Sequence, residues 1–329
     1  MLVFILRRLL QSVAVLLAVG VVAFSLFRYV GDPINAMVGQ DTSMEEREQL
    51  RDKLGLNDPA PVQFLRFISN ALQGKFGLSY RTSEPVGRVI LERLPATLEL
   101  SFCAAVFALL VGIPMGVYTG LYPRHWTSRL FQAVSLVGIS LPTFLIGILL
   151  ILLFSVVLHW LPSFGRGKTV DIGWWTTNFL TLKGLEALIL PSITLGLFQL
   201  TLIMRLVRSE MLEVMRTDYI KFARARGLTN RAINFGHALK NTLVPVITVT
   251  GLQLGAIIAF ALVTETVFAW PGVGQLFIQS VQFADIPVMA AYLMLIALLF
   301  VVINLVVDLL YFAVDPRLRG HGGDARASR

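Results

Sequence analysis

Apolar residues in this sequence are gathered into six long runs that contain no charged side chain. The runs cover residues 9–27, 100–123, 130–165, 187–204, 241–264 and 286–307. Each approaches or exceeds the roughly 20 residues that an α-helix needs to cross the hydrocarbon core of a membrane. The pattern predicts an all-α integral membrane protein with six transmembrane helices, and an even number of crossings places both termini on the same side.

The polar segments between these runs divide the predicted fold into four parts. Residues 1–30 form the first transmembrane helix, 31–95 an outer lobe, 96–314 the main membrane domain and 315–329 a frayed tail. The helices expected in the membrane domain cover 97–121, 130–160 with Pro142 in its middle, 186–207, 243–267 and 286–312. A short helix over 273–284 is expected near the outer surface, and the outer connection 161–185 carries two tryptophans that suit the membrane interface.

Glycines recur at every fourth position of the second predicted membrane helix, at Gly112, Gly116 and Gly120, and Gly251 and Gly255 repeat the spacing in the fifth. Small residues at this interval let the backbone of another helix approach closely. The neighbouring helix can belong to this chain or to another subunit, and the sequence favours the former.

The charged residues of the membrane domain are concentrated in a basic stretch, 208–241. The residues with helical apolar spacing in its first half are Met211, Met215, Tyr219 and Phe222. Gly227 stands where a helix often ends in a left-handed residue, and Thr229 can cap a second helix. The pattern predicts two short helices joined at a glycine outside the membrane, a form that suits docking on another protein. The alternative is a basic loop that only fixes topology.

The distribution of Lys and Arg predicts the orientation. Only 15 % of the 329 residues are charged, and the net charge is +8, whereas a soluble domain has about 25 % charged residues. With the N-terminus inside, the inner segments carry 16 of the 28 Lys and Arg residues, eight of them between Arg205 and Lys240. The long first outer loop translocates regardless of charge, so both termini are expected on the cytoplasmic side. The basic residues flank membrane helices, which gives no support to a nucleic-acid partner.

Residue types that catalysis or metal binding requires do not form a motif in this sequence. Cys103 is the one cysteine and lies within a membrane run. Residues 165–169 read Gly-Arg-Gly-Lys-Thr, but a phosphate-binding loop needs a glycine where Pro162 stands. We therefore expect no metal, no bound cofactor and no enzymatic activity in this chain.

Polar side chains within the predicted helices are candidates for a transport pathway or a gate. Near the inner face, an ion pair between Asp308 and Arg205 is favoured over a gating role. Glu265, near the outer face, is expected to have a structural role, with an outer arginine or a substrate as its possible partner. The candidate pathway residues are Gln199, Thr201, Thr248, Thr250 and Gln253, although threonine also serves packing in membrane helices.

Two segments carry a pattern typical of one protein family. The first contains Asp218-Tyr219, Ala223-Arg224-Ala225-Arg226-Gly227-Leu228, His237-Ala238-Leu239-Lys240-Asn241 and Pro245. The second reads Thr264-Glu265-Thr266-x-Phe268-x-Trp270-Pro271-Gly272-x-Gly274. Both closely resemble permease subunits of ABC importers in the dipeptide, oligopeptide and nickel branch. Lys221, Phe222 and Lys240 depart from the wider importer pattern, and these departures belong to the peptide branch.

The resemblance implies that the basic stretch contacts a separate ATP-binding subunit. The residues that it assigns to this contact are Tyr219, Ala223, Arg224, Ala225, Gly227, Leu228, His237, Leu239 and Asn241. It further implies a permease of the bacterial inner membrane that works by alternating access, in lipid, with a second related permease, two ATP-binding subunits and a periplasmic solute-binding protein. ATP and magnesium would then bind to the partner subunits.

The transported solute stays open at this point, because di- and oligopeptides, glutathione and nickel chelates are all carried by this branch. A different class of function is an ATP-independent secondary transporter or channel. Such a protein would rely on intramembrane charges or an inverted repeat, and neither is visible in the sequence.

Overall fold

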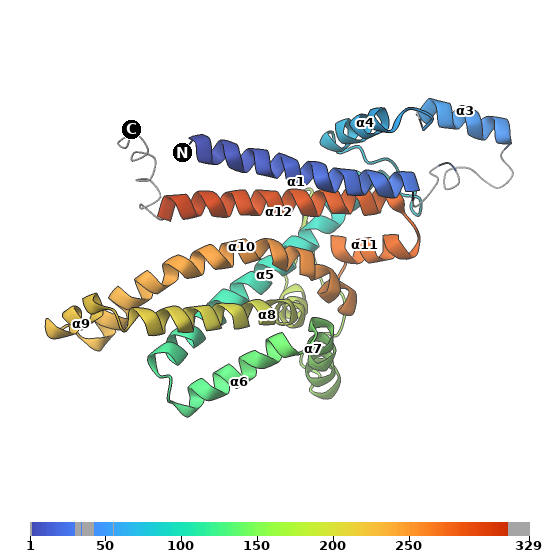
Figure 1. Cartoon of the computed structure of the whole chain (residues 1–329). Helices are drawn as coiled ribbons and strands as arrows, with labels where there is room; N and C mark the ends of the chain where they lie inside the picture. The colour runs from blue at the N-terminus through green and yellow to red at the C-terminus, as the bar shows by residue number, and fades with distance from the viewer. Residues whose placement is uncertain (1, 30–33, 35–42, 55, 315–329) are drawn as a thin grey trace, which may run out of the picture. The chain divides into compact units, whose positions relative to one another are not determined.

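The computed structural model describes residues 2–29, 34, 43–54 and 56–314, and this part of the chain is mainly helical (Figure 1). In chain order its helices and strands are α1 Leu2–Tyr29, α3 Met44–Leu54, α4 Ala60–Leu72, α5 Val86–Leu121, α6 Trp126–Ser140, α7 Thr143–Leu150, η1 Ile151–Val157, β1 Val170–Ile172, β2 Trp175–Thr177, α8 Leu182–Val214, α9 Asp218–Ala225, η2 Ala232–Ala238, α10 Leu239–Val267, α11 Val273–Gln282 and α12 Ile286–Val314. The η elements are π-helices. The predicted short helix at 273–284 is confirmed as α11, and the strands β1 and β2 pair as a hairpin that the all-α prediction did not include.

Four helices in the described part of the chain, α1, α5, α8 and α12, are long and apolar enough to cross a membrane. Two bent pairs raise the number of spans to six if each pair counts as one crossing. One bend, of 113°, lies between Trp126–Ser140 and Thr143–Val157; the other, of 49°, lies within α10. A continuous helix over 130–160 is therefore wrong, because Pro142 cannot continue α6 and instead precedes the first residue of α7.

The contacts of the chain divide it into two compact units. Unit 1 contains Thr97 and the described residues before it, together with Asp171–Thr177 and Pro271–Val301. Unit 2 contains Leu98–Val170, Asn178–Trp270 and the described residues from Val302 onward. The helices α5 and α12 each contribute residues to both units.

In unit 1, hydrogen bonds fix both ends of the short helix α11. The backbone N–H of Val273 donates to the hydroxyl of Thr97 at 2.9 Å, in a buried position. Beyond the other end, the carboxylate of Asp285 accepts from the hydroxyl of Ser79 at 2.5 Å and from the N–H of Tyr80 at 3.1 Å. Because Asp285 is buried, these donors satisfy a charge that water cannot reach. The segment around Ser79 is thereby joined to the start of α12.

In unit 2, α8 is the central helix, and α6, α7 and α10 all pack against it. Glycines let α5 approach closely as well. A β-carbon added at Gly116 would lie 2.6 Å from the β-carbon of Val207 and 2.8 Å from the carbonyl oxygen of Met204. In the opposite direction, a β-carbon at Gly196 would lie 2.7 Å from the carbonyl oxygen of Ala104. The predicted small-residue contact is confirmed, and its neighbour is a helix of the same chain.

We expect Gly116→Ala to destabilise the protein, because the added methyl group overlaps α8 and overpacking of this kind costs about 1–3 kcal/mol. The matched control is Gly236→Ala in η2, where an added β-carbon meets no atom within 4 Å. The effect is measured as a change in melting temperature, obtained by heating samples of the purified protein and determining the folded fraction of each by size-exclusion chromatography. A melting temperature of Gly116→Ala equal to that of Gly236→Ala would contradict the close α5–α8 packing.

Candidate functional site

The candidate site is the α9–η2 element, which consists of α9, η2 and the connecting residues 226–231. Three residues separate its start at Asp218 from the end of α8 at Val214. The hydroxyl of Thr217 donates to the Val214 carbonyl oxygen at 2.6 Å, and α9 starts at the next residue. The helical apolar spacing from Met211 to Phe222 predicted one helix, and this prediction is wrong because the chain turns at residues 215–217.

A glycine turn joins the two helices of the element, as the sequence predicted. Gly227 has a φ of +77°, in the left-handed region. The N–H of Leu228 donates to the carbonyl oxygen of Ala223 at 3.3 Å, which closes the end of α9. The N–H of Ala232 donates to the hydroxyl of Thr229 at 3.3 Å, so Thr229 caps the second helix as expected.

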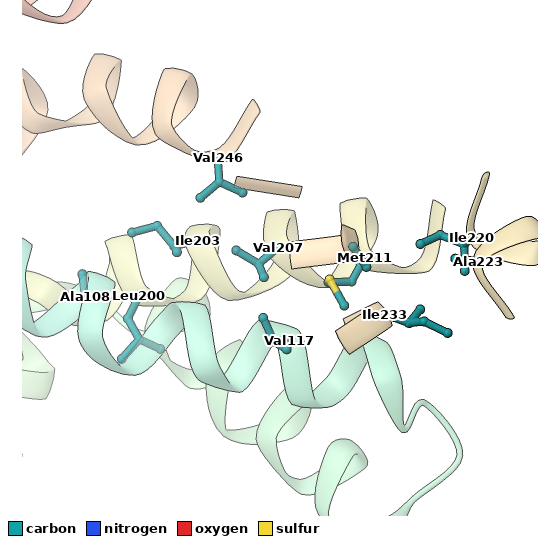
Figure 2. Packing of buried hydrophobic residues seen from close by; sticks show 11 residues of the cluster. Ala108, Val117, Leu200, Ile203, Val207, Met211, Ile220, Ala223, Ile233 and Val246 are labelled. Atoms are coloured by element: carbon teal, nitrogen blue, oxygen red, sulfur yellow. The ribbon is translucent and has the colours of Figure 1, made fainter. Parts of the chain in front are cut away.

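The buried face of the α9–η2 element packs into the apolar core of unit 2. The buried members of this core are Ala108, Val117, Leu200, Ile203, Val207, Met211, Ile220, Ala223, Ile233, Ala238 and Val246 (Figure 2). They come from α5, α8, α9, η2 and α10. Burial of apolar surface on this scale holds the element on the helices rather than leaving it as a free loop.

A hydrogen bond also ties α9 to the first turn of α10. The side-chain amide of Asn241 donates to the hydroxyl oxygen of Tyr219 at 2.7 Å. The buried hydroxyl of Thr242 donates to the carbonyl oxygen of Ala238 at 3.0 Å and lies 3.2 Å from the sulfur of Met211. Sequence analysis assigned Tyr219 and Asn241 to one surface, and the structure brings them together. It missed Thr242, which lies within an apolar run and follows no motif.

The exposed face of the α9–η2 element combines aromatic and basic side chains. Tyr219, Phe222, Leu228 and Phe235 are all exposed large hydrophobic residues. The guanidinium of Arg226 lies 5.8 Å from the ring centroid of Phe222. Aromatic residues and arginine are enriched at protein–protein interfaces, so this composition is typical of a docking surface.

The residues that the resemblance assigned to the ATPase contact fall into two groups. Ala223 is buried in the unit 2 core and Leu239 packs against that core half-buried. The exposed ones are Tyr219, Arg224, Ala225, Gly227, Leu228, His237 and Asn241. We infer that Ala223 and Leu239 support the surface from behind, and that the exposed residues are available to a partner.

The candidate pathway residues are mostly enclosed within unit 2. Gln199, Thr201 and Thr250 are buried, and Gln253 is half-buried. The side chain of Thr248 lies outside the described residues. The hydroxyl of Thr201 donates to the carbonyl oxygen of Ser135 at 2.9 Å, so it joins α8 to α6. A pathway role for these residues stays a prediction.

The two carboxylates near the membrane edges are both buried, Glu265 more completely than Asp308. Arg205, the arginine proposed to pair with Asp308, is exposed. Pairing of Asp308 with Arg205 stays a prediction.

A buried ion pair that the sequence did not predict joins α5 to the connecting segment 161–185. One carboxylate oxygen of Glu99 accepts from the guanidinium of Arg166 at 2.9 Å and from the backbone N–H of Asn178 at 3.1 Å. The Glu99 side chain is 2 % exposed and that of Arg166 is 9 % exposed. The side-chain amide of Asn178 donates in turn to the carbonyl oxygen of Arg166. An acidic residue at the edge of a predicted membrane helix was the available signal.

Among the residues that the structure describes, no group of three or more His, Cys, Asp or Glu side chains is placed to hold a metal ion.

Comparison with known proteins identifies the family. Residues 112–320 match the family described as the binding-protein-dependent transport system inner membrane component, and residues 1–101 match its N-terminal domain. The chain belongs to this family. Members of this family are permease subunits of transporters. The expectation that this chain is an ABC-importer permease is therefore confirmed.

Curated relatives of this permease cover almost its whole length. The dipeptide transport system permease protein DppB of Alkalihalophilus pseudofirmus is 36 % identical and covers 97 % of this chain and 100 % of the relative. The oligopeptide transport system permease protein AppB of Bacillus subtilis is 38 % identical, with 96 % and 98 % covered. The glutathione transport system permease protein GsiC of Escherichia coli is 37 % identical, with 97 % and 99 % covered.

The permease also shares its fold with a solved transporter. A chain of the methionine ABC transporter MetNI in an inward-facing conformation matches with a TM-score of 0.55 and 21 % identity, over 69 % of this chain and 96 % of that chain. At 21 % identity, this match supports a shared fold and no statement about the transported solute.

Proposed function

We propose that this chain is a membrane-spanning subunit of an ATP-driven importer of di- and oligopeptides in the bacterial inner membrane. The observation that carries the proposal is the α9–η2 element, in which an exposed aromatic and basic face is mounted on the core of unit 2. The relatives named as dipeptide and oligopeptide permeases support the choice of substrate. The chain itself performs no catalysis in this proposal.

The proposed mechanism begins at the α9–η2 element. An ATP-binding subunit docks on its exposed face, and closure of two such subunits displaces the element. The element is joined to α8 by a three-residue turn and continues without a break into α10, and the Tyr219–Asn241 bond links α9 to α10 as well. Displacement therefore moves α8 and α10 together. This movement opens the pathway alternately to the two sides of the membrane.

The proposed assembly contains this permease, a second related permease, two ATP-binding subunits and a periplasmic solute-binding protein. The description of the family as a binding-protein-dependent transport system supports the last of these. In this assembly the chain makes six crossings with both termini in the cytoplasm, residues 31–95 form the periplasmic lobe, and ATP with magnesium binds to the partner subunits.

The solute can differ from a simple peptide within the same mechanism. A relative named as a glutathione permease is as similar to this chain as the peptide permeases are. Glutathione is itself a tripeptide, so it belongs to the same chemical class. A panel of labelled dipeptides, longer peptides and glutathione bound by the cognate solute-binding protein distinguishes these solutes.

The proposal is tested by reconstituting uptake in vesicles that contain both permeases and a loaded solute-binding protein. We expect accumulation of labelled peptide only when the ATP-binding subunits and ATP are present. The control replaces ATP with a non-hydrolysable analogue. Uptake that proceeds at the same rate without ATP-binding subunits would instead support a secondary transporter.

A further inference from the structure

The helix α4 lies against the second half of α1 and contains no buried residue (Figure 1). One side of α4 contacts α1 through aromatic rings. Phe64 meets Phe24 edge to face at a centroid distance of 5.6 Å, and Phe67 lies 5.6 Å from Phe27. Nearby, a β-carbon added at Gly20 would lie 2.8 Å from the side chain of Ile68, so the two helices are close there as well.

These contacts place α4 against the end of a candidate membrane span. The helix α1 is a candidate span over Leu6–Tyr29, and the uncharged run within it ends at Phe27. Gly20 precedes Phe27 by seven residues, which is roughly 10 Å along an α-helix. The segment of α1 that α4 touches therefore lies within the last two turns of a transmembrane span, at the depth of the upper acyl chains and the headgroup boundary.

The apolar face of α4 continues beyond its contacts with α1, because Leu65 and Leu72 lie about one turn to either side of Ile68 and are exposed. Pro61, Leu65 and Leu72 have the spacing of one helix face. Leu65 is 68 % exposed and Leu72 is 85 % exposed. Beside α4, the side chains of Val21 and Val22 on α1 are exposed as well, as expected for a lipid-facing helix.

The polar side of α4 is occupied by contacts with the preceding loop. The side-chain amide of Gln63 donates to the carbonyl oxygens of Leu56 and Asp58, each at 2.7 Å. The guanidinium of Arg66 forms an ion pair with the carboxylate of Asp58 at 2.7 Å. These polar residues are thus directed away from the apolar stripe, which fixes the rotation of α4 about its axis.

We propose that α4 is an interfacial membrane helix whose stripe Pro61–Leu65–Leu72 is inserted among the acyl chains of the outer leaflet. An amphipathic helix with a polar upper face and an apolar lower face takes this position at a bilayer surface. The first part of the outer lobe is thereby anchored by lipid as well as by α1. The occupant of the stripe is lipid because the aromatic contacts hold α4 against the last two turns of the candidate span α1, at the boundary between acyl chains and headgroups.

Site-directed fluorescence in the assembled transporter tests the proposal. Cys103 is the single cysteine of the chain, so Cys103→Ser provides the background for Leu65→Cys, Leu72→Cys and the polar-face control Asn70→Cys. Each is labelled with a nitrobenzoxadiazole dye and reconstituted in lipid nanodiscs with its partner subunits. All three positions are exposed, so the changes remove no core packing. Co-purification of the partner subunits checks assembly.

We expect lipids with a nitroxide at an upper acyl position to quench the labels at positions 65 and 72 several-fold more strongly than the label at 70. Iodide, a quencher confined to water, should show the reverse order. Iodide access at 65 and 72 equal to that at 70 would place the stripe in water and overturn the proposal. Protection of both labels from both quenchers would overturn it too, because a protein surface would then cover the stripe.

Discussion

Replacing Gly227 by Leu is expected to abolish ATP-driven uptake while the chain still reaches the membrane. Gly227 has a φ of +77°, where an L-residue is strained by roughly 1–2 kcal/mol. A β-carbon at this position meets no atom of the chain within 4 Å. The leucine side chain therefore projects from the surface proposed to contact the ATP-binding subunit. Peptide uptake by whole cells, normalised to the amount of permease in the membrane, measures the effect.

A matched pair of alanine variants separates the backbone effect from the surface effect. Both Gly227 and Gly236 have open space around an added β-carbon, but only Gly227 has a positive φ. We expect Gly227→Ala to reduce uptake and Gly236→Ala to leave it close to the parental rate. Gly227→Asp is expected to behave like Gly227→Leu. Parental uptake by Gly227→Leu at a normal membrane level would remove the basis for the coupling role.

Replacing Arg166 by Met is expected to be among the most destabilising single changes in this chain. It leaves the carboxylate of Glu99 buried without the guanidinium that faces it, and breaking a buried pair in this way costs about 3–5 kcal/mol. The reading is the melting temperature of the purified protein together with its yield from membranes. The double change Glu99→Leu with Arg166→Met should recover much of the loss, because it removes both charges.

The control for Arg166→Met is Arg88→Met. Arg88 and Glu92 also form an ion pair at 2.9 Å, but their side chains are 70 % and 58 % exposed. An exposed pair contributes little to stability because water and salt screen it. Equal melting temperatures for the two methionine variants would show that the Glu99–Arg166 pair does not hold the outer connection to α5.

The apolar runs predicted where helices form, but not where they end. The second membrane helix was expected to begin at residue 97, yet α5 begins at Val86. The fourth was expected to end at residue 207, yet α8 continues to Val214. In both cases the helix continues through polar residues outside the apolar run; in α5, two of them, Arg88 and Glu92, are exposed and pair with each other within the helix. An apolar run indicates which part of a helix lies within the membrane, whereas the full length of the helix depends also on tertiary contacts.

Residue types close together in the sequence predicted the turn of the candidate site, whereas the hydrogen bonds between distant residues could not be predicted from the sequence. The left-handed glycine at Gly227 and the cap at Thr229 depend on residues within one turn, so spacing alone indicated them. The bond from Asn241 to Tyr219 joins residues 22 apart, and the Glu99–Arg166 pair joins residues 67 apart. Such pairings arise only when distant segments of the chain pack together. A motif could place the first pair on one surface but could not show that they touch.

Because α8 is one continuous helix, the rotation of its last residues about the helix axis is fixed relative to its first residues. Its 33 residues extend over about 50 Å at the usual rise of an α-helix. The first end is fixed by its cap at Thr181, and the last residues lead into α9 through the turn at Thr217. A single inserted residue would rotate one end against the other by about 100°. We therefore expect α8 to tolerate a substitution of an exposed residue better than the insertion or deletion of one residue.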